Sequence, residues 1–411
     1  MATQTDEVLR QRKSAIHLIL MFGLVSLFGD IIYEGARSVN GPYLKTIGAN
    51  AALVGLVAGI GEFLGYAIRL VSGYFADKTK AYWIFTFIGY GMLITVPLMS
   101  LTGIWQMVAV YIVLERIGKA IRSPAKDTIV SQASKQVGTG FGFGLQEAMD
   151  QIGATVGPLI FTVLFVWLGR GNKTVADYQK GYGLLWLPFL LLMACVIIAY
   201  LRVPDPSKLE VALNKPREPD KLSTVFWLYT LFSFVATLGF VNFVLIGYHL
   251  KAQNVLPDAQ IPFFYAVAMA IDGVVALLIG KGYDILKTRM KNEKAGLFTL
   301  IVIPVFSILI PVLGFTTNAA FAITAVLLWG VVMGAHETIM KSAIADLTPL
   351  KKRGTGYGIF NTSYGLAMFF GSAAMGFLYD VSRPSLIVVS VALELMAIPL
   401  FFMVKNSAGK I

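Results

Sequence analysis

Carboxylic acids and an arginine lie inside a long apolar stretch near the start of this sequence. Asp30, Glu34 and Arg37 are spaced four and three residues apart, so a helix would carry all three side chains on one face. Inserting an ionised group into a membrane span costs about 2.5–3.5 kcal/mol, and such groups normally face a cavity. We therefore expect Asp30 and Glu34 to bind protons or a solute, with Arg37 as their partner. The alternative is a triad that pairs internally and only holds its helix in place.

A second apolar stretch repeats this pattern with Glu147 and Asp150, which are three residues apart. Together with Asp30 and Glu34 they would form a negative pocket. Mutual repulsion and loss of hydration would favour proton uptake by at least one of these four acids. A proton carrier needs such a group.

Basic residues that could oppose these acids lie between residues 105 and 126. Glu115 and Lys119 are four residues apart and can pair on one helix, while Arg116 could reach the pocket. Arg122 begins the sequence RSPAKD, which is typical of a helix end and a turn, so we predict a gating role for it. Glu62 and Arg69 share a helix face but are two turns apart, which indicates a salt bridge to another helix.

The second half of the chain has fewer charges and more neutral hydrogen-bonding groups. We predict that the first half carries protons and that the second half binds the solute. The candidates in the second half are Asn242, Asp272, His336, Glu337, Asn361 and Tyr364.

Composition excludes most soluble classes, because 56% of the 411 residues are hydrophobic and only 14% are charged. Most apolar runs exceed the roughly 18–20 residues that span about 30 Å of hydrocarbon. We predict twelve membrane helices, at residues 15–43, 50–75, 82–103, 105–126, 140–168, 182–201, 223–249, 262–283, 295–314, 319–345, 355–379 and 384–404.

The basic residues predict the orientation of these helices. With the N-terminus inside, the inner segments hold 24 Lys and Arg and the outer loops hold 6. We therefore expect an integral protein of a prokaryotic inner membrane with both termini in the cytoplasm. The net charge of +11 follows from this bias, so no nucleic-acid partner is expected.

The sequence indicates an internal duplication. A similar glycine-rich run occurs twice, as Gly138-Thr139-Gly140-Phe141-Gly142 and as Gly354-Thr355-Gly356-Tyr357-Gly358. A polar stretch rich in proline and charge separates the two copies. We predict an N-terminal six-helix bundle over residues 1–202, a cytoplasmic linker over 203–222 and a C-terminal six-helix bundle over 223–411.

Two short motifs resemble those of the major facilitator superfamily. Gly73, Asp77 and Lys78 follow the superfamily's pattern between helices 2 and 3, and Gly280 with Asp284 repeats it after helix 8. Lys80 stands where that pattern has glycine. The resemblance implies two pseudo-symmetric six-helix bundles that rock about a central site, with a gate formed by Gly73, Asp77, Lys78, Gly280 and Asp284. We expect Arg122, from its position, to belong to the same gate.

The predicted fifth helix carries Gly144, Gly153, Gly157 and Pro158, which is similar to the motif of proton-coupled exporters in that superfamily. Small residues four apart let helices approach closely. This resemblance favours export as the direction of transport. The alternative is that these residues serve only to pack the helix against a neighbour.

The remaining residues argue against other chemistry. The chain has one cysteine and three histidines (His17, His249 and His336), with no His pair at metal-ligand spacing. No nucleotide-binding motif or catalytic triad is found, so we expect no enzyme, no cofactor and no bound metal. We predict a monomeric secondary transporter that exports a small organic solute in exchange for protons. Proton symport, facilitated uptake of a metabolite and divalent metal export remain alternatives.

Overall fold

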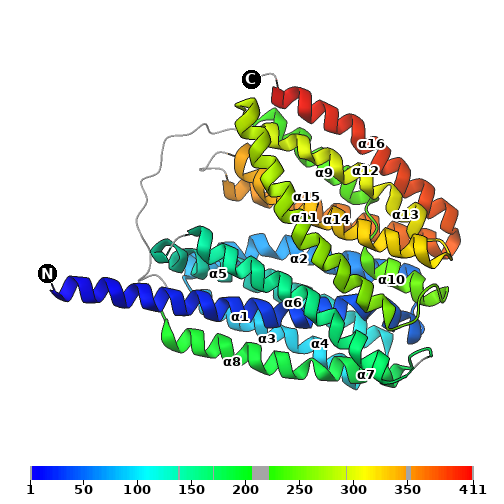
Figure 1. The fold of residues 1–411 in the computed structure, drawn as a ribbon, viewed down its shortest axis with the longest axis horizontal. Helices are drawn as coiled ribbons and strands as arrows, with labels where there is room; N and C mark the ends of the chain where they lie inside the picture. Colours follow the sequence, from blue (N-terminus) through cyan, green and yellow to red (C-terminus); the bar gives the residue numbers. More distant parts are fainter. Residues whose placement is uncertain are drawn as a thin grey trace.

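The computed structural model describes residues 2–137, 139–169, 171–205, 222–292, 294–348 and 353–409. Every regular element in these ranges is a helix. The long helices run alongside one another, and the two chain termini, at the left and at the top of Figure 1, lie at the same end of the bundle. We call this end the terminal end and the opposite one the distal end.

The helices of the first half are α1 (Ala2–Thr46), α2 (Ala51–Thr79), α3 (Tyr82–Gly91), α4 (Thr95–Leu98), α5 (Trp105–Val137), α6 (Thr139–Trp167), α7 (Val175–Leu184) and α8 (Trp186–Arg202). The spans of this half alternate in direction from the terminal end, where α1 starts, and α3 with α4 and α7 with α8 each form one span. The helices of the second half are α9 (Thr224–Gly239), α10 (Phe243–Ala252), α11 (Gln260–Met290), α12 (Val302–Ser307), α13 (Leu309–Gly314), α14 (Ala319–Leu347), α15 (Arg353–Val381) and α16 (Arg383–Gly409).

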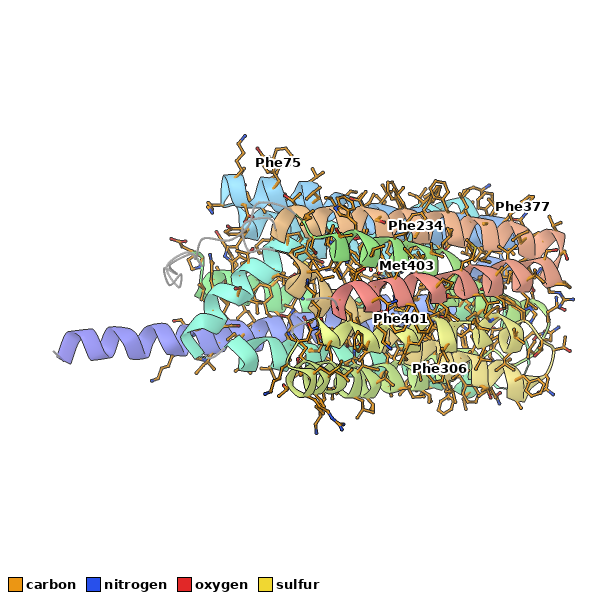
Figure 2. All side chains as sticks on the ribbon, turned by 90° about the horizontal axis from the view of Figure 1, so that it is seen from above. Phe75, Phe234, Phe306, Phe377, Phe401 and Met403 are labelled. Carbon is orange, nitrogen blue, oxygen red and sulfur yellow. The ribbon has the colours of Figure 1, made fainter. Side chains whose placement is uncertain are left out.

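The predicted all-α membrane fold is confirmed. Ten helical stretches of the described chain are long and apolar enough to cross a bilayer. The long helices α5 and α15 complete the predicted set of twelve. Figure 2 shows side chains projecting from the outer faces of the helices, among them Phe75 and Phe377, which are 48% and 60% exposed. An apolar outer surface of this kind is stable in lipid and not in water.

One helix boundary was predicted wrongly. The RSPAKD segment does not end a helix, because α5 continues through Pro124 to Val137. Proline has no N–H, so it cannot bond the carbonyl four residues earlier, which is that of Ala120. The hydroxyl of Ser72 on α2 donates to this carbonyl instead, at 2.8 Å. A neighbouring helix thus satisfies the bond that proline removes.

The predicted helix over residues 223–249 is interrupted. Its two parts, α9 and α10, are separated at residues 240–242. The side chain of Asn242 accepts a hydrogen bond from the N–H of Val244 (2.9 Å) and so caps α10. The indole of Trp329 on α14 donates to the freed carbonyl of Val241 (3.1 Å). The break is therefore stabilised by hydrogen bonds from both sides.

The predicted glycine motif packs α6 against α1. A Cβ atom on Gly153 or Gly157 would collide with the carbonyl oxygens of Leu27 and Ile31, respectively. Pro158 follows within the same helix. Gly144 lies in α6 among residues whose side-chain surroundings are outside the described part. The motif thus provides close helix packing, which was one of its two interpretations.

The two halves also meet closely at the distal end. Gly41 of α1 leaves no room for a side chain beside the backbone of α10 at Val244. On the neighbouring face, the carboxylate of Asp380 on α15 accepts hydrogen bonds from the N–H groups of Ala51 (3.2 Å) and Ala52 (2.8 Å), which begin α2. Negative charge at a helix N-terminus is favourable. These contacts close the distal end between the halves.

Candidate functional site

A cavity of about 630 Å³ lies between the two halves. It is lined by α1, α2, α3, α5 and α6 of the first half and by α11, α14 and α15 of the second. Ten of the predicted binding residues line it: Asp30, Glu34, Arg37, Arg116, Glu147, Asp150, Asp272, Glu337, Asn361 and Tyr364. The helices therefore bring together residues that are more than 300 positions apart in the sequence.

Two predicted binding residues do not line this cavity. Asn242 caps α10, as described above. His336 of α14 is 2% exposed, and neither of its ring nitrogens has a hydrogen-bond partner among the described residues. Its ring packs between Phe240 and Tyr364, at centroid distances of 5.6 and 6.1 Å. His336 thus packs against Tyr364, which does line the cavity.

A chain of ion pairs crosses the first half of the cavity wall. Arg37 lies 3.6 Å from both Glu34 and Glu62. Arg116 lies 3.1 Å from Glu62 and 3.6 Å from Glu115. Glu62 of α2 therefore joins α1 to α5, which is the inter-helix salt bridge expected for it. The expected pair of Glu115 with Lys119 is wrong, because the ion pair of Glu115 is with Arg116.

Tyrosines that the sequence did not single out complete this chain. The hydroxyl of Tyr33 accepts hydrogen bonds from both Arg37 (3.2 Å) and Arg116. The ammonium group of Lys119 lies 3.9 Å from the centre of the Tyr33 ring, close enough for a cation–π interaction. Tyr33 lies three residues after Asp30 and four before Arg37, so helical spacing could have found it.

One hydrogen bond of the site joins the two halves directly. The hydroxyl of Tyr265 on α11 donates to the carboxylate of Glu34 on α1. The ring of Tyr265 packs against Phe243 at 4.3 Å, immediately after the break between α9 and α10. No spacing pattern links residues 231 positions apart, so sequence reasoning missed this contact.

A second group of acids lies on α1 and α6. Asp30 interacts electrostatically with Asp150, as expected for the predicted negative pocket, but also with the cation Lys119. Gly153 makes this approach possible, because a Cβ atom there would lie only 3.0 Å from that of Asp30. Glu147 also lines the cavity. The four acids of the two helices thus share one space.

The second half contributes Asp272 and Glu337, which interact with each other electrostatically. Asp272 is 4% exposed, and its Oδ1 has no hydrogen-bond partner in the described chain. Gln151 of α6 bonds the carboxyl group of Asp272 across the halves. A buried carboxyl oxygen without a partner is costly, so this site favours a ligand that can donate a hydrogen bond.

The acids of the two predicted gating motifs are exposed at the terminal end. Asp77 accepts a hydrogen bond from the hydroxyl of Tyr82 (3.1 Å), which begins α3. No ion pair of Asp77 or Asp284 occurs between described residues. Lys80 ends α2 with φ of 55°, the left-handed conformation that glycine adopts more easily.

The other predicted gating residues contact neighbouring helices. A Cβ atom added to Gly73 would lie 3.4 Å from Pro124 of α5, and one added to Gly280 would lie 3.4 Å from Thr338 of α14. The ammonium group of Lys78 lies 5.8 Å from the ring of Tyr74. Arg122 lines the cavity, with its guanidinium 4.8 Å from the ring of Tyr90.

The three best-defined features are membrane-spanning helices, two halves, and a charged cavity between them. Together they define a membrane transporter of a small solute. The chain belongs to the Major Facilitator Superfamily, whose family model matches residues 20–372.

Relatives of similar length support this assignment. The chain is 39% identical over 402 residues to the uncharacterized protein Rv2265 of Mycobacterium tuberculosis, covering 96% of this chain and 95% of the relative. It is 25% identical over 370 residues to the uncharacterized MFS-type transporter MJ1317 of Methanocaldococcus jannaschii, covering 89% of each.

Solved structures share the fold at low sequence identity. A bacterial homologue of the human lysosomal transporter Spinster, in an inward-facing and unoccupied conformation, superposes with a TM-score of 0.70 at 14% identity, covering 96% of this chain and 98% of that one. A POT family transporter in complex with 5-aminolevulinic acid gives a TM-score of 0.71 at 12% identity, covering 95% and 96%.

Proposed function

We propose that this chain exports a small organic solute in exchange for protons, by alternating access. The observation that carries this proposal is the position of Glu34. Its carboxylate pairs with Arg37 on its own helix (3.6 Å) and accepts a hydrogen bond from Tyr265 of the other half. One titratable group is therefore bonded to both halves at the cavity.

Proton binding at Glu34 would change both of these interactions. A neutral carboxyl group has no ionic attraction to Arg37, and it is a poorer acceptor for the Tyr265 hydroxyl. The link between α1 and α11 would weaken, and the halves could move apart at the distal end. Asp30, Glu147 and Asp150 would pass protons to and from the cavity.

Alternating access is supported by the distribution of contacts between the halves. The backbone contact at Gly41 and the cap on α2 by Asp380 both lie at the distal end. At the terminal end, the gating acids Asp77 and Asp284 are exposed and form no ion pair in the described chain. We take this as the state open toward the terminal end, which is cytoplasmic in the proposed orientation.

Export as the direction of transport is supported by the resemblance of Gly144, Gly153, Gly157 and Pro158 to the motif of proton-coupled exporters. The small residues Gly153 and Gly157 form a seam that would let α1 and α6, which carry the acids, slide along each other. We place the protein in a prokaryotic inner membrane as a monomer, with both termini in the cytoplasm. The domain boundaries stay as proposed, with bundles over 1–202 and 223–411.

The test uses the purified full chain in proteoliposomes containing a pH-sensitive dye. A panel of organic cations, organic acids, sugars, zwitterions and divalent metals is added under a pH gradient of either sign. Antiport predicts that a transported solute moves protons in the opposite direction. Movement in the same direction would indicate symport, and solute flux that ignores the gradient would indicate facilitated diffusion.

Variants link the result to the site. Asp30→Asn and Glu147→Gln should abolish solute-driven proton movement, whereas Lys180→Gln, on an exposed side chain of α7, should not. Proton exchange that is unchanged in both acid variants would refute the coupling proposal. Exchange of divalent metals alone would favour the metal alternative over an organic solute.

A further inference from the structure

The two walls of the cavity carry different charge. Among the described residues, all the cationic side chains that line it come from the first half: Arg37, Arg69, Arg116, Lys119, Arg122 and Lys126. The second half lines the cavity with two carboxylic acids, Asp272 and Glu337, and with no lysine or arginine in its described part. A solute between the walls therefore meets a mixed surface on one side and an acidic surface on the other.

Some of the cations are already neutralised. Arg37 and Arg116 belong to the ion-pair chain centred on Glu62, and Lys126 lies 3.9 Å from Asp127. The other three have no carboxylate within ion-pair distance in the described chain, and one of them, Arg122, lies over the ring of Tyr90 at 4.8 Å. Lys119 contacts the ring of Tyr33, and Arg69 lies over the ring of Tyr66 at 4.9 Å.

Lys119 and Arg69 both line the cavity from the first half. The acids Asp30 and Glu34 attract the ammonium group of Lys119, whereas Arg69 repels it as a like charge. The Nε of Arg69 is buried without a hydrogen-bond partner in the part of the chain that the structure describes. An anionic group that enters the cavity can bind both side chains, because guanidinium and ammonium groups bond carboxylates strongly.

Asp272 and Glu337 form the matching negative group. Neither has an ion pair among the described residues, and one oxygen of Asp272 is buried without a partner. The two acids repel each other unless a cation or a proton is added. A solute ammonium group with three N–H donors would satisfy both carboxyl groups.

The two groups lie at comparable depth in the bundle. Helices α2, α5, α11 and α14 all begin at the distal end, and Arg69 and Glu337 each lie 18 residues beyond the first residue of their helix (69 − 51 and 337 − 319). Lys119 lies 14 residues along α5 and Asp272 lies 12 along α11. At about 1.5 Å per residue, these depths are roughly 18–27 Å.

Aromatic rings connect the groups across the cavity. Tyr66, beside Arg69, packs edge-on against Tyr364 of the second half, with ring centroids 4.9 Å apart. Glu337 interacts electrostatically with both tyrosines. A solute that spans the cavity would therefore touch a cation at one end and a carboxylate at the other.

We propose that the transported solute is bipolar, with an amino group held by Asp272 and Glu337 and an anionic group held by Lys119 and Arg69. This inference rests on the proposed transport function. A purely anionic solute would leave Asp272 and Glu337 unpaired, and a purely cationic one would leave Arg69 without a carboxylate partner. Either would keep charges uncompensated in a buried site, which disfavours it relative to a bipolar solute.

The test uses ω-aminocarboxylates of three to eight carbons, so that the spacing between the two charges is varied. Each is compared with its N-acetyl derivative, which lacks the cation, its amide, which lacks the anion, and its N-acetyl amide, which lacks both. Binding to the detergent-purified full chain is measured by calorimetry. At least one bipolar compound should bind ten-fold or more tightly than each of its three derivatives.

Two variants test which residues bind each end of the solute. Glu337→Gln should weaken binding of the bipolar compound and of its amide, but not of its N-acetyl derivative. Lys119→Gln should weaken the bipolar compound and the N-acetyl derivative, but not the amide. Glu394→Gln, a buried acid of α16 that does not line the cavity, is the matched control. Unchanged thermal unfolding without ligand shows that each variant is folded.

The outcomes separate this inference from the proposed function. Equal binding of all four compounds at every length, or no binding of any bipolar compound, overturns the bipolar solute. The same panel is then added to proteoliposomes under a pH gradient. If a singly charged compound drives proton exchange and the bipolar ones do not, the solute class is wrong and the transporter function stands. If no compound of this panel or the broader solute panel moves, the proposed function fails.

Discussion

Single residues of the cavity wall carry more than one interaction, and Glu62 is the clearest example. Its carboxylate neutralises Arg37 of α1 and Arg116 of α5, and all three side chains are almost fully buried. The stability of the site therefore depends on one acid on α2. Removing one member of a buried ion pair leaves an uncompensated charge, which typically costs about 3–5 kcal/mol.

We expect Glu62→Gln to lower the unfolding temperature in detergent substantially, because two guanidinium groups would lose their shared counter-charge. Asp177→Asn removes an acid from a more exposed ion pair with Lys180 and should have a much smaller effect. Equal unfolding temperatures for Glu62→Gln and the unchanged protein would contradict the role of Glu62. Thermal unfolding followed by intrinsic fluorescence provides the measurement.

A second prediction concerns the hydrogen bond between the halves. Tyr265→Phe removes the hydroxyl that donates to Glu34 and leaves the ring packing intact. A hydrogen bond to a charged group contributes about 1.5–3 kcal/mol, so the exchange rate should change at least ten-fold. Proton flux in proteoliposomes measures it. Tyr200→Phe, on the outer face of α8, is the control and should leave the rate unchanged.

At the scale of the elements, two helices depend on their neighbours for their geometry. Helix α5 continues through Pro124 because the hydroxyl of Ser72 on α2 donates a hydrogen bond to the carbonyl of Ala120. Helix α6 lies against α1 because Gly153 and Gly157 have no side chains to separate them. The positions of the functional acids follow from these contacts, since Asp30 and Asp150 are brought together by the seam.

Ser72→Ala should destabilise the protein by about 1–3 kcal/mol, because the carbonyl of Ala120 would be buried without a donor. Thr79→Ala removes a hydroxyl that bonds the carbonyl of Phe75 within α2, and serves as the control at an exposed site. Denaturation monitored by fluorescence compares the two. If both variants unfold alike, the bridge between α2 and α5 does not contribute.

Gly157→Ala should be destabilising by about 1–3 kcal/mol, because the added methyl group would force α6 away from the backbone of α1 at Ile31. Gly91→Ala places the same group where no atom lies within 4 Å. This control should be neutral or slightly stabilising, since alanine favours helix over glycine. Thermal unfolding of both variants, with proton exchange as a second readout, tests the seam.

For the whole molecule, the decisive feature is which end of the bundle holds the halves together. Asp258, between α10 and α11, accepts hydrogen bonds from Lys173 N–H (2.5 Å) and the Tyr178 hydroxyl (3.3 Å) of the first half. It also pairs with Lys251 of its own half (2.5 Å). One carboxylate therefore fastens the connection between α6 and α7 to the second half at the distal end.

Asp258→Ala should shift the protein toward opening at the distal end. A loss of about 1–2 kcal/mol changes such an equilibrium roughly 5–30-fold. The measurement is the labelling rate of Met269→Cys, a cavity position, by an impermeant maleimide applied from the distal side in a Cys195→Ala background. Asp177→Ala, whose bonds stay within the first half, is the control. An unchanged labelling rate would show that Asp258 does not hold the distal end closed.

Much of this architecture could be predicted from the sequence, for physical reasons. Membrane spans are recognisable because lipid requires long apolar helices, so the helix set and the family were predicted before any contact was known. Buried charges such as Asp30 and Glu34 stand out in such spans because they are costly. The continuation of α5 through Pro124 and the break before Asn242 were missed, because each depends on a donor from another helix.

Pairings between distant residues were decided by the tertiary structure alone. Local spacing predicted a Glu115–Lys119 pair. In the folded chain Glu115 pairs with Arg116, which also forms an ion pair with Glu62. No pattern in the chain links Tyr265 to Glu34 or sorts the cavity cations onto one wall. Composition and periodicity determine which segments enter the membrane, because those properties are local. Which charges meet inside it depends on how the helices pack, because an ion pair forms only where two side chains are brought within a few ångströms.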